Sequence, residues 1–353
     1  MKKAFDNKLI FGYLALVCVV MFPLLRGHEM DVDMIWKCCM GLMQLGTLCT
    51  SILMFRRLFE GKASKYPVFW GVLLYMSCPY RIYVCYDLAD MAQAVVWAVI
   101  PLYIWAVLGI VRNRKMNQKN MLNLGVATLS LAGIGYTNLM QMLVVAGFTL
   151  LVALCAREWF LLVSLTAGSA LTLPHLLGLY RYLFRGAYEE LGLPVNSIMG
   201  SGYVLGEFFS SFVYREGHPG VGLGMMLCLL TGLWLMFVKG EKLTGDKPLS
   251  FSRKACVWFV ALAAVLLLMS LQAFPWEYVQ RLGQWALKLV SLLETPGIFF
   301  GMAQIALCVP GAWAMERLEQ QEDKGLFAGL AVLVFIACLG GCIGYRYPAV
   351  GII

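Results

Sequence analysis

Long apolar segments recur along the whole chain and are separated by short polar stretches. Hydrophobic residues make up 61% of the 353 residues, charged residues make up 14%, and the mean hydropathy is +0.75. A water-soluble fold of this size could not bury so much apolar surface, since soluble domains carry about 25% charged residues. The sequence therefore predicts an all-α, polytopic integral membrane protein, a single transmembrane domain over residues 1–353. Spans need roughly 17 to 25 apolar residues, and eleven are predicted, at 9–25, 34–55, 66–80, 91–111, 121–136, 139–155, 159–180, 220–238, 255–273, 296–314 and 326–345. Residues 121–155 could also form one long kinked helix with a re-entrant turn.

Basic residues concentrate in short segments between these apolar stretches, and the net charge is +8. They form no basic patch with interleaved aromatic residues, so no nucleic-acid partner is expected. Their placement follows the positive-inside rule and predicts a cytoplasmic N-terminus and an outer C-terminus. The largest outer loop is then 181–219, and 274–295 is an interfacial outer segment anchored by Trp276 and Trp285. We expect a multi-pass protein of the cytoplasmic membrane, in contact with lipid.

The N-terminus and the cysteines each have an ordinary explanation. Residues 1–25 resemble a signal peptide but lack a small-x-small cleavage site, so we expect a retained first helix. Most of the twelve Cys residues fall inside apolar segments, where a thiol serves as a small buried hydrophobe. No pair of CxxC motifs, and no CxxC with two His, occurs at zinc spacing.

Acidic residues alternate in the first predicted outer loop, at Glu29, Asp31 and Asp33. Neighbouring carboxylates can hold a divalent cation together, or one can raise the pKa of the other so that it accepts a proton. The alternative is a solvated loop whose acids stabilise the N-terminal end of the next helix. Asp31 and Asp33 are therefore the candidate catalytic residues, and also the candidate ligands of a divalent cation, the cofactor this pattern suggests.

A second polar stretch joins the third and fourth predicted spans. Pro79 is expected to end the third helix. Arg81 could hold a phosphate with two parallel hydrogen bonds, or it could form a structural ion pair with Asp87 or Asp90. His175, near the end of another predicted helix, is either a hydrogen-bonded structural residue or a base.

Residues 76–102, MSCPYRIYVCYDLADMAQAVVWAVIPL, resemble a stretch of bacterial polytopic membrane proteins of the YfhO type and their 6-pyruvoyl-tetrahydropterin synthase-related relatives. In that pattern Pro-Tyr-Arg precedes an Arg-Gly-Asp-x-x-Glu-like element and a helix containing Pro. Arg81 and Asp90 match the pattern. Leu88 and Ile298 stand where it has Arg, and Gln93 stands where it has Glu. Further pieces that resemble the family are LTLPHLLGLY, FPWEYV and LLETPGIFF.

The resemblance implies a GT-C-like core, as in membrane glycosyltransferases that use lipid-linked sugars and keep acidic catalytic residues in the first outer loop. It implies transfer of a sugar from a polyprenyl-phosphate donor to an acceptor at the outer face. Asp31 belongs to both acidic pairs and is the preferred base. The pterin chemistry in the family's name is not implied. The candidate substrate-binding residues are Arg81, Asp87, Asp90, Gln93, His175 and Glu207.

Two other functions stay open. A catalytically inactive relative would act as a scaffold for envelope-assembly proteins in cell-envelope polysaccharide assembly, and the missing Glu and Arg residues favour it. A transporter of a lipid-linked substrate would carry charges at mid-membrane and helix breaks in paired half-repeats. Lys37 lies inside a predicted span but near its end, where its amine can reach the surface, so transport is the weakest alternative.

Overall fold

The chain is helical in a computed structural model that describes residues 12–18, 21, 34–59, 66–88, 90–113, 117–185, 202–209, 219–237, 253–291, 297–319 and 324–344. These residues contain no strand, only an isolated parallel bridge between Tyr203 and Leu271. The predicted all-α class is confirmed. The elements are α2 (Met34–Leu58), α3 (Tyr66–Met76), α4 (Pro79–Ile82), the π-helical turn η1 (Tyr83–Asp87), α5 (Met91–Arg112), α6 (Gln118–Thr137), α7 (Leu139–Ala156), α8 (Trp159–Leu171), α9 (Leu173–Arg185), the 3-10 turn η3 (Leu205–Phe209), α10 (Leu223–Phe237), α11 (Arg253–Ser270), α12 (Trp276–Gln280), α13 (Gln284–Ser291), α14 (Gly297–Glu319) and α15 (Lys324–Gly344).

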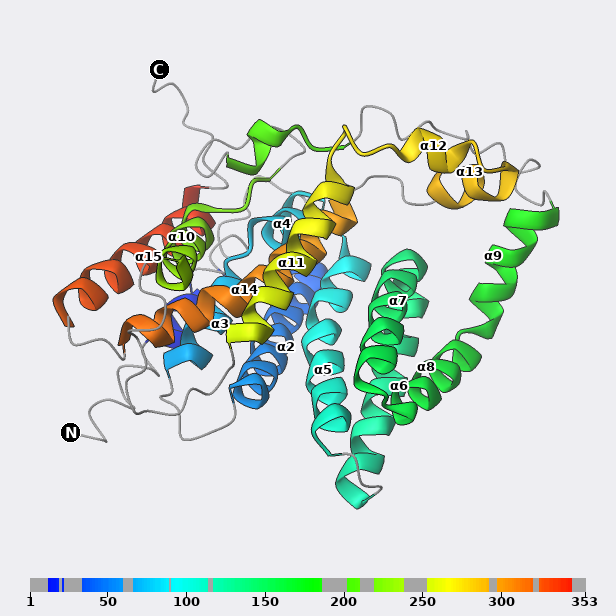
Figure 1. Cartoon of the computed structure of the whole chain (residues 1–353), viewed down its shortest axis with the longest axis horizontal. Coiled ribbons are helices and arrows are strands. Elements are labelled where there is room, and N and C mark those ends of the chain that lie inside the picture. The colour runs from blue at the N-terminus through cyan, green and yellow to red at the C-terminus, as the bar shows by residue number, and fades with distance from the viewer. Residues whose placement is uncertain are drawn as a thin grey trace.

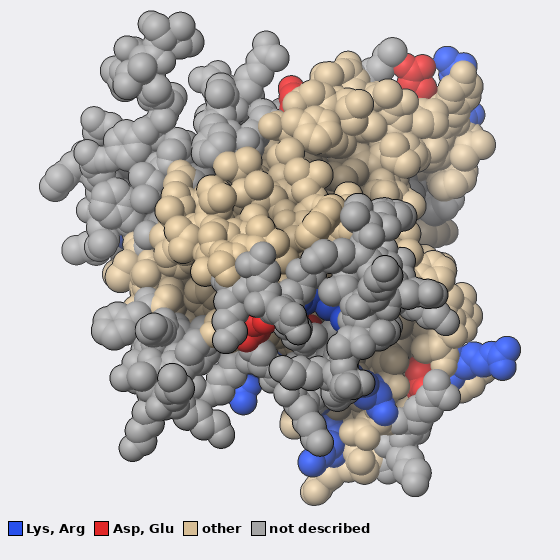
Figure 2. Space-filling view, turned by 60° about the vertical axis from the view of Figure 1, so that its left-hand side comes forward, with Lys and Arg blue, Asp and Glu red and all other residues tan. Residues whose placement is uncertain are grey.

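Several helices are long and apolar enough to cross a membrane. Within the described residues these are α2, α5, α7 and α14, and there are six candidate spans if the bent pairs α3 with α4–η1 and α8 with α9 each count as one. Figure 2 shows a broad area without charged side chains across the upper part of the face it presents, and most charged side chains lie along the right-hand edge and in the lower part of the view. These features indicate a membrane protein. Every predicted segment from 34–55 onward contains a helix, but the number of eleven spans and the orientation stay predictions.

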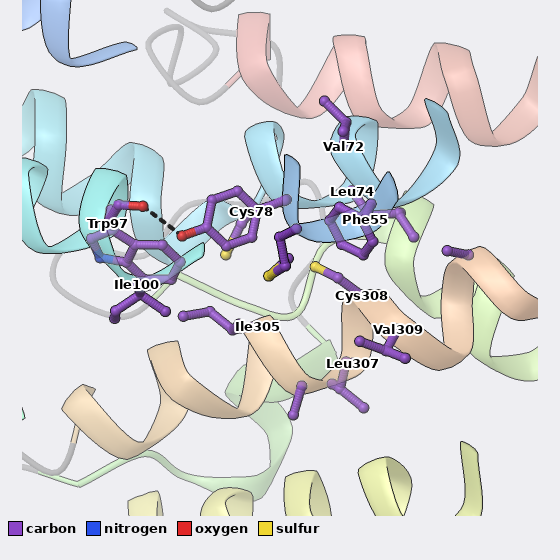
Figure 3. Packing of buried hydrophobic residues seen from close by; sticks show 14 of the residues in the cluster. Phe55, Val72, Leu74, Cys78, Trp97, Ile100, Ile305, Leu307, Cys308 and Val309 are labelled. Atoms are coloured by element: carbon purple, nitrogen blue, oxygen red, sulfur yellow. Dashed lines mark hydrogen bonds between the residues drawn. The ribbon is translucent and has the colours of Figure 1, made fainter. Parts of the chain in front are cut away.

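Helix α14 lies at the centre of one half of the bundle, where it packs against α3, α10, α11 and α15 (Figure 1). In the most apolar 18-residue stretch of α14, 94% of the residues are buried, so this helix is surrounded by protein and exposes little surface to lipid. Two glycines of α14 permit this close packing, because a Cβ on Gly301 or Gly311 would lie 2.6 Å from Tyr80 or Leu74. Figure 3 shows Cys78, Trp97 and Ile305 among the buried residues of this core.

The other half of the bundle runs from α5 through α6, α7 and α8 to α9. Helix α9 leaves α8 and reaches α13, which together with α12 covers one end of the bundle (Figure 1). These two helices occupy most of the predicted interfacial segment 274–295. Trp276 packs on Phe299, with ring centroids 5.5 Å apart, whereas Trp285 is exposed.

Arg57, in the last turn of α2, joins the helices α2, α5 and α6. Its guanidinium lies 4.1 Å from the centroid of the Trp105 ring. Nη1 donates to the Trp105 carbonyl oxygen at 2.8 Å and to Oδ1 of Asn123 at 3.0 Å. Gly109 leaves room for these groups, because a Cβ there would lie 2.5 Å from both Arg57 Nη1 and Asn123 Nδ2.

The structure defines the helix boundaries in three predicted segments. Pro79 was expected to end the third helix: α3 ends at Met76, three residues earlier than Pro79, which is the first residue of α4. The predicted span 159–180 breaks at Thr172 into α8 and α9, bent by 70°. Residues 121–155 form two helices, with Asn138 as the C-cap of α6 and the N-cap of α7.

Candidate functional site

The α3–α4 break is the feature around which the candidate site is built. Proline has no backbone N–H, and its ring clashes with the carbonyl of residue i−4, so Pro79 cannot continue α3 but suits the first position of a new helix. The two pieces are bent by 46°. A break inside an apolar bundle leaves carbonyl groups at the end of α3 and N–H groups at the start of α4 without helical partners. Long polar side chains form hydrogen bonds with groups on both sides of the break.

Arg81 forms the hydrogen bonds on the carbonyl side of the break, at the end of α3. The side chain is fully buried, and its guanidinium donates to the Met76 carbonyl oxygen and to Oε1 of Gln44 on α2. Its Nε has no hydrogen-bond partner. Among the described side chains no carboxylate forms an ion pair with it, so the predicted pair with Asp90 is absent; the side chain of Asp87, the other predicted partner, lies outside what the structure describes. A buried cation held by neutral groups is therefore the central element of the site.

Gln304 on α14 forms the hydrogen bonds on the N–H side of the break, at the start of α4. This fully buried amide accepts a hydrogen bond from the Tyr80 backbone N–H at 3.2 Å and one from the Cys78 thiol at 2.5 Å. Its Nε2 donates to the Gly220 carbonyl oxygen at 2.8 Å. One side chain thus connects the break, α14 and the segment leading into α10.

Asp90 is the N-cap of α5, and a carboxylate oxygen accepts a hydrogen bond from the backbone N–H of Gln93 at 3.0 Å. The side chain of Gln93 is buried and accepts a hydrogen bond from Nε2 of Gln141 on α7. Oε1 of Gln141 is buried and has no partner. Gln93 therefore contacts a polar residue from a different helix.

Residues 202–209 bring Glu207 to the same end of the bundle. Its Oε2 accepts a hydrogen bond from the Val204 backbone N–H at 2.8 Å, which starts η3. Tyr203 stacks on Phe300 with ring centroids 4.3 Å apart, and its backbone bonds to Ser270 and Gln272 at 2.9 Å each. Burial raises the pKa of the Tyr203 phenol well above its ordinary value.

The structure brings some of the predicted site residues together. The thiol of Cys85 interacts electrostatically with both Arg81 and Asp90. Tyr80 interacts with Asp90, and Tyr203 interacts with Tyr80 and Glu207. Arg81, Asp90, Gln93 and Glu207 thus belong to one region around the α3–α4 break and the start of α5.

Other predicted residues are elsewhere or are not described. His175 is exposed on α9, where its ring meets the edge of Tyr136 at 4.7 Å between centroids. Asp31 and Asp33 lie outside the described residues, and for Asp87 only the backbone, in η1, is described. No group of three His, Cys, Asp or Glu side chains that could hold a metal ion occurs in the described ranges.

Three residues of this region were missed by the sequence analysis: Gln44, Gln141 and Gln304. Each is an amide in an otherwise apolar helix. Polar residues inside membrane helices are rare and tend to face protein, so an amide within an apolar segment is the signal that could have identified them. Comparison with protein-family models, with curated proteins and with solved structures found no match to this chain.

Proposed function

We propose that this protein binds a polyprenyl-phosphate-linked sugar at the outer face of the cytoplasmic membrane and transfers the sugar to an acceptor. The observation that carries the proposal is Arg81, a fully buried guanidinium hydrogen-bonded only to neutral groups among the described residues. Arginine is well suited to phosphate because its donors match two phosphate oxygens at once. The polyprenyl chain would lie against apolar helix surfaces and the phosphate would approach the α3–α4 break.

The proposed step is an inverting displacement. The acceptor hydroxyl oxygen bonds to the anomeric carbon while the bond from that carbon to the phosphate oxygen breaks. The hydroxyl proton passes to the carboxylate of Asp31, and polyprenyl phosphate leaves with the bonding electron pair. Arg81 stabilises the charge that develops on the phosphate, and we assign the binding of sugar hydroxyls to Asp90 and Gln93. Asp31 and Asp33 could also hold a divalent cation, but the step is assigned without it.

A transfer assay with a lipid-linked sugar tests the proposal. We expect Asp31→Asn to lose transfer by about a hundredfold or more, as for loss of a general base, and Arg81→Gln to lose both binding and transfer. His175→Gln is the matched control, because the described side-chain contact of His175 is with Tyr136 on α6 and not with Arg81, Asp90 or Gln93. Wild-type rates in the Asp31→Asn and Asp33→Asn variants would disprove the catalytic assignment.

The second candidate is a catalytically inactive, lipid-binding partner in envelope polysaccharide assembly. Two acidic side chains favour this candidate because they have structural roles. Asp90 and Glu207 both accept hydrogen bonds from backbone N–H groups at helix starts. This candidate predicts that wild type binds polyprenyl phosphate without turnover. Binding lost in Arg81→Gln, in a protein with no transfer activity, would select it over the enzyme.

Both candidates need the site to face outward. Reporter fusions at residues 114–116 should be active in the cytoplasm, and fusions at residues 186–201 should be active outside. The reverse pattern would exclude chemistry at the outer face.

A further inference from the structure

Gln44 is an amide in the middle of the apolar helix α2, and it is buried at 2% exposure. Its Oε1 accepts a hydrogen bond from the guanidinium of Arg81, 37 residues further along the chain. Its Nε2 lies 3.9 Å from the Met40 sulfur, a weak acceptor one turn earlier on the same helix. Gln44 also hydrogen-bonds to the Cys85 thiol, so its contact with a charged group is the one with Arg81.

The electrostatics of this contact are unusual. A buried arginine normally pairs with a carboxylate, because an uncompensated charge in a low-dielectric interior is costly. Arg81 instead bonds to a neutral amide and to the Met76 carbonyl at the C-terminal end of α3. A helix C-terminus carries only about half a negative charge. Most of the guanidinium's positive charge thus stays uncompensated by the described residues, and its Nε is unpaired.

Glutamate has almost the same size and shape as glutamine and would neutralise Arg81 from the same position. We infer that Gln44 is a positioning residue that fixes the Arg81 guanidinium without neutralising it, so that its charge is available to an anionic phosphate ligand. The identity of the anion rests on the proposed function. The uncompensated charge rests on the hydrogen bonds and burial alone.

Thermal unfolding of the full-length protein in detergent tests this inference with two variants of matched size. Gln44→Glu adds a carboxylate opposite Arg81, and Gln44→Met removes the hydrogen bond without adding charge. Each protein is measured alone and with polyprenyl monophosphate, with inorganic phosphate, or with polyprenol. Ser51→Ala is the control, because this buried serine bonds within its own helix.

We expect Gln44→Glu to have a higher Tm than wild type without ligand, and to lose about tenfold or more in apparent affinity for polyprenyl monophosphate. Gln44→Met should have a lower Tm than wild type, bind the lipid phosphate more weakly, and still respond to it. Stabilisation of wild type by polyprenyl monophosphate but not by inorganic phosphate would identify the lipid as the source of the anion; equal responses would identify free phosphate.

The outcomes separate the two ideas. If Gln44→Glu were no more stable than Gln44→Met, Arg81 would already be compensated and the inference would be wrong. The same holds if Gln44→Glu bound the lipid phosphate as tightly as wild type does. If no phosphate stabilised wild type while Gln44→Glu still raised the Tm, the proposed function would fail and the uncompensated charge would be supported.

Discussion

Gln93 and Gln141 join α5 and α7 through a hydrogen bond between their side chains. Each glutamine stands three residues after a helix N-cap, Asp90 or Asn138, whose side chain accepts from the glutamine backbone N–H. In a capping box the glutamine side chain would return to the N-cap backbone N–H. Both N-cap N–H groups here already donate to carbonyls of the preceding turns, at 3.2 and 2.7 Å. The two amides are therefore free to bond to each other between helices.

A double-mutant cycle measures this bond. Gln93→Leu or Gln141→Leu alone leaves the other amide without its partner, and we expect each to lower the free energy of unfolding by about 1 to 3 kcal/mol. The double variant should lose less than the sum, with a coupling of about 0.6 to 2 kcal/mol. Unfolding in mixed micelles provides the measurement. Additivity within about 0.5 kcal/mol would mean that the pair contributes no coupling.

Replacing Gln304 tests its role at the α3–α4 break. Gln304→Leu removes an acceptor from Cys78 and Tyr80 and a donor from Gly220, all of them buried. We expect a loss of about 3 kcal/mol or more of unfolding free energy. Cys78→Ala removes only the thiol donor and should cost less than half as much. Equal effects of the two variants in chemical unfolding would show that the backbone contacts of Gln304 contribute little.

Two glycines offer a matched test of packing at the other end of the bundle. A Cβ at Gly109 would meet Arg57 and Asn123 at 2.5 Å, whereas a Cβ at Gly125 on α6 would meet nothing within 4 Å. Gly109→Ala should therefore destabilise by about 1 to 3 kcal/mol. Gly125→Ala should be neutral or stabilise by up to about 1 kcal/mol through helix propensity. Thermal unfolding of the two variants side by side provides the measurement, and a tolerated Gly109→Ala would show that the ends of the Arg57 and Asn123 side chains can move aside at little cost.

Tyr203 gives the stability a dependence on alkaline pH. Burial raises its pKa in the folded protein above the unfolded value of about 10. Its contribution is fully present below the unfolded pKa and is lost as pH rises toward the folded pKa, because the unfolded state releases its proton first. Tyr203→Phe keeps a ring for the stack on Phe300 and has no proton to lose. The Tm of wild type should fall more steeply above about pH 10 than that of Tyr203→Phe; parallel curves would show that Tyr203 titrates normally.

Hydropathy predicted the all-α class and the position of most helices, because apolar segments in lipid have few alternatives to a helix. It could not place the breaks. Pro79 and Pro174 indicate that a helix is interrupted, yet they do not tell whether the proline ends one helix or begins the next. The site was predicted in part: Arg81 and Asp90 were identified, but the partners Gln44 and Gln304 were not. Pairing between residues more than 30 positions apart is set by tertiary packing, which the periodicity of one segment does not report.

The hydrogen bonds of Gln304 also constrain how the chain can be assembled during synthesis. Cys78 and Gln304 are separated by 226 positions. At a synthesis rate of about 5 to 20 residues per second, the ribosome needs about 10 to 45 s to reach Gln304 after Cys78 has been made. Throughout that interval the start of α4 lacks its acceptor. The newly inserted N-terminal helices must therefore wait at the translocon, or hold water at the break, until the last third of the protein arrives.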